Sequence, residues 1–130
     1  MSEADFYRFC RLLKVTVTEM PLRVSGFYYR VMGRDFIAVD SRLTGPAKLV
    51  VMFHELAHVL FHAPESGATA NFHDVGKKTR HELEADAFAL CAIIPVSVIV
   101  AASSIQPLLD EGMPTEILSE RMSVYERFGI

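Results

Sequence analysis

The alternation of apolar and polar positions predicts one helix and then strands in the first third of the chain. Residues 3–13 carry apolar side chains at the spacing of an amphipathic helix, which we expect to pack across a sheet. The runs 15–17 and 26–40 are rich in β-forming residues, and the second turns at Met32 to Asp35, where Gly33 can adopt a positive φ. We therefore predict a β-hairpin in this region.

The remainder of the chain predicts helices. Pro46 suits the first turn of a helix, and residues 47–61 are apolar enough for a central, largely buried one. Residues 65–76 are small and polar, which is typical of a loop. Further helices are predicted over residues 79–94, stopped by Pro95, and over residues 96–103 and 115–128.

Length, composition and charge limit the class of protein. The chain has 130 residues, of which 51% are hydrophobic, and we expect one domain over residues 1–130 with a sizeable core. The net charge of -3 offers no basic surface for a nucleic-acid backbone, so we expect no direct DNA or RNA ligand. The apolar stretch 87–102 is shorter than a bilayer span of about 20 residues, and it reads as a buried helix rather than a membrane segment.

The N-terminus and the cysteines indicate the compartment. No basic segment followed by an apolar one and a small-residue cleavage site opens the chain, so we expect no signal peptide. Cys10 and Cys91 stand far apart in apolar surroundings, which is typical of buried thiols and not of a disulfide framework. A cytoplasmic protein is the expectation.

The predicted central helix carries polar residues that an apolar core does not favour. His54 and His58 are four residues apart, so they lie on one face of the helix, where two imidazoles can reach one ion. Glu55 lies beside that face and can contact a water without being a ligand. Imidazole ligands with an open position for water are typical of catalytic zinc, and an adjacent carboxylate can act as the base. We therefore predict Zn²⁺ held by His54 and His58, with Glu55 as the catalytic residue.

The second predicted helix offers the third ligand. Its acidic residues are Glu82, Glu84 and Asp86. Glu82 and Asp86 share a face, whereas Glu84 points about half a turn away. We favour Glu82 as the ligand, with Asp86 accepting the free N–H of a ligating histidine, and Glu84 remains the alternative.

Both patterns also have an interpretation without a metal. The two histidines could be core residues with hydrogen-bond partners, and the second helix could expose an acidic face to solvent. Burying two histidines and a carboxylate without partners would cost several kcal/mol, however, and Ala85, Phe88 and Leu90 argue against a fully exposed helix. The metal site is therefore the favoured interpretation.

Taken together, these motifs resemble the ImmA/IrrE-type metallopeptidases. HELAHVLFH is similar to their active-site helix with its trailing histidine, and ELEADAFALCAIIP to their second helix. GFYYRVMGRDFIAVDSRL resembles the strand pair before the active-site helix, and RMSVYERFGI resembles a common closing segment. The resemblance covers residues 24–100 well and the tail more loosely. Asp86 is a departure, because many relatives carry asparagine at that position.

The resemblance implies an α+β fold: a zincin-like minimal metallopeptidase core of the thermolysin type, with a small antiparallel sheet on the metal-bearing helix and further helices. It implies that His54, His58 and Glu82 are the ligands and Glu55 the base. It also implies a cytoplasmic endopeptidase of a bacterium or mobile element, whose substrate is often an XRE-type helix-turn-helix repressor that is cleaved to release transcription. We expect no room here for the extra DNA-binding or sensory domain of some relatives, so any effect on transcription would pass through a partner.

His62 is one turn beyond His58 but is not predicted to be a ligand. Over the eight residues from His54 the helix rises about 12 Å, too far for atoms that must each lie ~2 Å from one ion. We interpret His62 as a capping or packing residue.

Other side chains could approach the cleft. His73 and His81 read as surface residues, although either could hold the oxyanion of a tetrahedral intermediate. Tyr28 and Tyr29 alternate faces on their strand, so one should enter the core and the other could line the substrate groove.

Two hypotheses on function follow from these residues. The favoured one is a zinc-dependent endopeptidase acting on a regulatory protein, with residues 36–39 as an edge strand to which an extended peptide adds. The alternative is a non-catalytic zinc-binding module that controls a partner by binding, with His73 or His81 as a fourth protein ligand.

Overall fold

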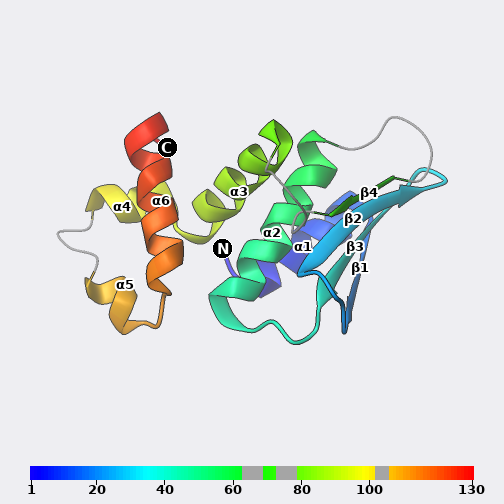
Figure 1. Ribbon diagram of the computed structural model, residues 1–130, viewed down its shortest axis with the longest axis horizontal. Helices are drawn as coiled ribbons and strands as arrows, with labels where there is room; N and C mark the ends of the chain where they lie inside the picture. The colour runs from blue at the N-terminus through cyan, green and yellow to red at the C-terminus, as the bar shows by residue number, and fades with distance from the viewer. Residues whose placement is uncertain (63–68, 73–78, 102–105) are drawn as a thin grey trace.

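A computed structural model of the protein describes residues 1–62, 69–72, 79–101 and 106–130. Its elements, in chain order, are α1 (Glu3–Leu13), β1 (Val15–Met20), β2 (Gly26–Val31), β3 (Arg34–Asp40), α2 (Gly45–Phe61), β4 (Thr69–Phe72), α3 (Arg80–Ile93), α4 (Val96–Ala101), α5 (Gln106–Asp110) and α6 (Thr115–Phe128). In Figure 1 the sheet lies at one end of the molecule, α2 and α3 lie in the middle, and α4, α5 and α6 lie at the other end.

The sheet has the strand order β1-β3-β2-β4. The hairpin of β2 and β3 is confirmed, and it turns through Met32 and Gly33, both with positive φ (51° and 76°), as a two-residue hairpin loop of this hand requires. The predicted α+β fold is also confirmed. The sheet is mixed, however, and not wholly antiparallel, because β1 runs parallel to β3.

The strand expected to be a free edge is in fact central. Residues 36–39 belong to β3, which pairs with β1 on one side and with β2 on the other. Its backbone N–H and C=O groups are therefore used by neighbouring strands, and a peptide cannot add there. In the described part of the chain, the outer strands are β1 and β4.

Helix α2 packs against one face of this sheet. Gly26 of β2 makes the close approach possible, because a Cβ at that position would lie 2.8 Å from both the carbonyl oxygen of Ala38 and Cγ1 of Val51. Helix α1 packs beside β1 and α2, where the rings of Phe6 and Phe53 meet edge to face with centroids 5.7 Å apart. The core therefore lies between the sheet and these two helices.

Helix α3 packs along α2, and α6 packs against α3 (Figure 1). The fully buried Arg121 of α6 donates from Nε to the carbonyl oxygen of Ile94, at the end of α3, over 2.6 Å. Its Nη1 donates to the carbonyl oxygen of Ile130 over 2.7 Å. In the part of the chain that the structure describes, no helix is both long enough and apolar enough to cross a membrane.

Candidate metal centre

Helix α2 carries His54 and His58 into the interior of the molecule. The segment from residue 51 to residue 58 is buried, and the two histidines are only 2% and 1% exposed. Because they are one turn apart, their rings lie together, with centroids 4.9 Å apart. Two imidazoles thus share one face of a buried helix, as the sequence predicted.

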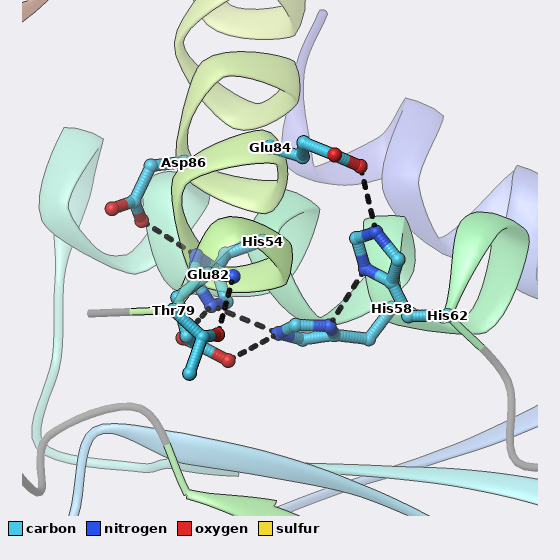
Figure 2. Close-up of polar contacts among 7 residues, drawn as sticks. All are labelled: His54, His58, His62, Thr79, Glu82, Glu84 and Asp86. Atoms are coloured by element: carbon cyan, nitrogen blue, oxygen red, sulfur yellow. Dashed lines mark hydrogen bonds and ion pairs between the residues drawn. The ribbon is translucent and has the colours of Figure 1, made fainter. Parts of the chain in front are cut away.

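The first turn of α3 brings Glu82 to the same place. The side chain of Thr79 caps the helix by accepting a hydrogen bond from the backbone N–H of Glu82 (3.2 Å), which fixes where α3 begins. The Glu82 carboxylate then lies 2.9 Å from Nε2 of His54 and 2.9 Å from Nε2 of His58. Figure 2 shows the two rings and this carboxylate pointing toward one another.

The donor atoms of these three residues fit a zinc ion. The two Nε2 atoms are 3.2 Å apart, and all the donor atoms of the set lie within 4.8 Å of one another. Around a tetrahedral zinc with ligands at ~2.0 to 2.1 Å, two ligand atoms are about 3.3 Å apart, close to the spacing found here. Two imidazoles and one carboxylate form a known ligand set for catalytic zinc. The three residues could therefore hold a metal ion.

The other ring nitrogens of the two histidines point away from this cluster. Nδ1 of His54 lies 2.7 Å from Oδ1 of Asp86, which is where the sequence predicted a support for a ligating histidine. Nδ1 of His58 lies 3.1 Å from Nδ1 of His62. Both rings are thus oriented so that Nε2 faces Glu82.

Glu55, the predicted catalytic base, is fully buried on the same helix. Its Cγ lies 3.7 Å from where a Cβ of Gly26 would stand, so its side chain lies on the side of α2 that faces β2. A carboxylate in the interior, one residue from His54, has no place in an ordinary apolar core. Its catalytic role stays a prediction.

His62 makes contacts with residues of α3 that were not predicted from the sequence. Nε2 of His62 lies 3.0 Å from Oε2 of Glu84, and Nε of Arg80 donates to Oε1 of the same carboxylate over 2.9 Å. The hydrogen bond with His62 holds the pKa of Glu84 below its ordinary value, and Arg80 lowers it further. The four-residue spacing from His58 to His62 was the available signal, but it did not reveal Glu84 as the next partner.

The remaining candidates lie elsewhere. His81 is exposed, and its ring stacks on that of His62 with centroids 4.0 Å apart, so it is not among the donors that converge in the described residues. His73 lies outside the described residues. Tyr28 enters the core and donates to Oδ1 of Asp35 over 2.7 Å, whereas Tyr29 lies on the sheet face that points away from α2. Neither tyrosine is therefore placed to line a cleft at the cluster.

A separate groove of about 850 Å³ lies between α3 and α6. Asp86 and Glu84 contribute to its wall, but His54, His58 and Glu82 do not. Its lining is mainly apolar and includes Leu83, Phe88 and Phe128 of the two helices. The groove is thus a neighbour of the cluster and not part of it.

Comparison with known proteins places the chain in a family. The model of a peptidase family, M78, described as an IrrE N-terminal-like domain, matches residues 10–125, which is most of the chain. No curated protein and no solved structure matches the chain. The match spans both helices of the cluster and the three strands that precede α2. The chain therefore belongs to the M78 peptidase family with an IrrE N-terminal-like domain.

Proposed function

We propose that this protein is a zinc-dependent endopeptidase in which His54, His58 and Glu82 hold the metal and Glu55 is the catalytic base. The observation that carries the proposal is the convergence of two buried Nε2 atoms and one carboxylate from two helices, at spacings of 2.9 to 3.2 Å. Membership of a zinc-dependent peptidase family supports the choice of metal and reaction.

In the proposed reaction the metal would activate water, and the chain transfers the proton. Bound zinc would supply a Lewis acid that makes water acidic enough to act as a nucleophile near neutral pH. The Glu55 carboxylate takes one proton from the attacking water as its oxygen bonds to the carbonyl carbon, and it delivers that proton to the amide nitrogen as the C–N bond breaks. The buried position of Glu55 keeps the proton transfer away from bulk solvent.

The edge of β4 that faces away from β2 is the proposed place for the substrate backbone. Of the strands described, β4 pairs only with β2, so one side of it can accept an extended peptide by backbone hydrogen bonds. The strand is also close in sequence to both helices of the cluster. Six residues separate Phe72, its last residue, from Thr79 at the start of α3, and a segment of similar length joins the end of α2 to its first residue, Thr69. This edge replaces β3, the edge expected from the sequence.

The resemblance to ImmA/IrrE-type peptidases extends the proposal to the substrate. We propose a regulatory protein, such as an XRE-type helix-turn-helix repressor, as the target in the cytoplasm. The protein itself would not contact DNA, since its net charge of -3 opposes binding to a phosphate backbone. Control of transcription would then act through cleavage of the repressor.

Two substitutions test the catalytic assignment. Zinc content and cleavage of a candidate repressor should be measured for the native chain, Glu55→Gln and His58→Ala. We expect Glu55→Gln to keep zinc and to lose about 10²- to 10⁴-fold in cleavage rate, the usual contribution of a general base. His58→Ala should lose both zinc and cleavage, because one of three ligands is gone.

The outcomes separate the peptidase from the alternative hypothesis. Native cleavage rates in Glu55→Gln would show that the base is wrongly assigned. If the native chain and Glu55→Gln both bind zinc and the repressor, but neither cuts it, the protein is a non-catalytic zinc-binding module.

A further inference from the structure

Helix α2 ends in a way that places a third histidine against a candidate ligand. His62 is the C-cap residue, and its backbone N–H donates to the carbonyl oxygen of His58 over 2.9 Å. Its side chain is only 5% exposed and turns back toward the cluster, so that the two Nδ1 atoms are 3.1 Å apart (Figure 2). His62 therefore does more than end the helix.

The positions of the hydrogens in this contact follow from the bonds that each ring makes. If His58 binds a metal through Nε2, its remaining ring hydrogen is on Nδ1, and Nδ1 must donate. Nδ1 of His62 must then accept, which places the hydrogen of a neutral His62 ring on Nε2. That hydrogen points at the Glu84 carboxylate, 3.0 Å away, which is an acceptor. Each donor thus meets an acceptor along the whole series.

The far end of this series is also held in place. Arg80 donates to the second oxygen of Glu84 over 2.9 Å, although its 91% exposed side chain makes that ion pair a weak one. The ring of His81 lies nearly parallel to that of His62, with 12° between the planes. The Glu84 carboxylate and the flat neighbouring ring together fix the orientation of His62.

We propose that His62, oriented by Glu84, is a positioning residue that holds His58 in the tautomer and orientation that present Nε2 to zinc. This inference rests on the proposed metal site. It gives Glu84, the acidic residue that points away from the cluster, a role matching that of Asp86, which contacts Nδ1 of His54. Partners of this kind usually change metal affinity about 10- to 100-fold.

Substitutions at His62 can separate the acceptor from the bulk of the ring. In His62→Phe the ring remains but the acceptor is lost, whereas in His62→Asn the side-chain oxygen stands near the former Nδ1 and can still accept. We expect the zinc dissociation constant, measured by competition with a chelator, to rise about 10- to 100-fold in His62→Phe and much less in His62→Asn. The visible absorption of the Co²⁺-loaded protein should change in His62→Phe and stay close to native in His62→Asn.

Glu84 supplies a second variant and Glu120 a matched control. Glu84→Ala removes the acceptor for Nε2 of His62, so zinc affinity should fall in the same direction as in His62→Phe. Glu120 is an exposed glutamate on α6, across the same groove, so Glu120→Ala makes the same change in charge without touching His62. Zinc affinity should be native in Glu120→Ala, and circular dichroism of the metal-free proteins should show that all variants fold.

The results distinguish failure of this inference from failure of the metal site. If the native chain binds zinc and His62→Phe binds it with native affinity and an unchanged Co²⁺ spectrum, the positioning role is wrong and the metal site stands. Equal losses in His62→Asn and His62→Phe would also contradict an acceptor role. If His58→Ala binds zinc as well as the native chain, the proposed metal site itself is wrong. Should His62→Phe not fold, His62→Asn and Glu84→Ala still decide the matter.

Discussion

At the scale of single residues, the two cysteines show how burial changes chemistry. Both are free, as the sequence predicted, but the fold covers them differently. Cys10 is 2% exposed on the inner face of α1, and burial raises the pKa of its thiol to about 11. Cys91 is partly buried and lines the groove between α3 and α6. Since the thiolate is the reactive form, the two should differ in reactivity.

We predict that iodoacetamide at pH 8 labels Cys91 well before Cys10 in the native protein. With a pKa of about 11, only about one Cys10 thiol in a thousand is ionised at that pH. The neighbouring side chains also shield the buried sulfur from the reagent. A time course of peptide masses gives both rates, and the Cys10 rate should rise as the pH approaches 11. The folded Cys91→Ala variant should stay almost unlabelled until denaturant is added. Equal rates at the two cysteines would contradict the burial of Cys10.

The histidines mark the limit of prediction from residues alone. Helix geometry correctly placed His54 and His58 on one face, because a spacing of four residues fixes that relation whatever the surroundings. It could not show where the ring of His62 would turn, since that depends on the C-cap backbone (φ -130°, ψ 22°) and on Glu84, which another helix supplies. Contacts between elements are therefore the part of the site that the sequence left open.

At the scale of elements, the seating of α2 on β2 depends on one glycine. Gly26 lets the helix come close enough for Glu55 to lie beside the strand. Any larger side chain meets the backbone carbonyl of Ala38 and the side chain of Val51, both at 2.8 Å. The two elements can therefore approach closely only because this position has no side chain.

We predict that Gly26→Ala lowers the free energy of unfolding by about 1 to 3 kcal/mol, the usual cost of overpacking a core. Val51→Ala removes one of the two atoms that the new methyl group would meet, so the double variant should be more stable than the sum of the single changes implies. Denaturant unfolding of the four proteins in this cycle measures the coupling. Strict additivity would mean that the methyl group and Val51 do not meet.

The helices were predicted more accurately than the strands, and the difference has a physical reason. Helices α2, α3 and α6 were found to within two residues, because proline and the apolar period mark helix ends locally. Strand β4 was taken for part of a loop, since its four residues lie among small polar ones. The pairing of β1 with β3 was missed as well, because a parallel pair joins segments that are distant in sequence. Strand order therefore had to come from the structure.

At the scale of the whole molecule, α3 joins the sheet end to the C-terminal helices. One side of α3 packs along α2, and its end is tied to α6 by the bond from Arg121 to Ile94. Its first turn carries Glu82, and Ala85, three residues further along the helix, is fully buried. A ligand that bridges α2 and α3 would therefore stabilise the contact through which the sheet end is connected to the C-terminal helices.

Zinc should for this reason stabilise the fold and not only complete the site. His58 and Glu82 belong to different helices, 24 residues apart in sequence, and unfolding separates them. An ion that binds only the folded chain raises the free energy of unfolding by about 2.7 kcal/mol when its free concentration is 100 times the dissociation constant. We expect a rise of this size for the native chain and for Glu55→Gln, measured by urea unfolding at buffered zinc concentrations, and none for His58→Ala. A similar rise in His58→Ala would mean that zinc binds elsewhere, whereas no rise in the native chain would mean that the three donors do not act as one site.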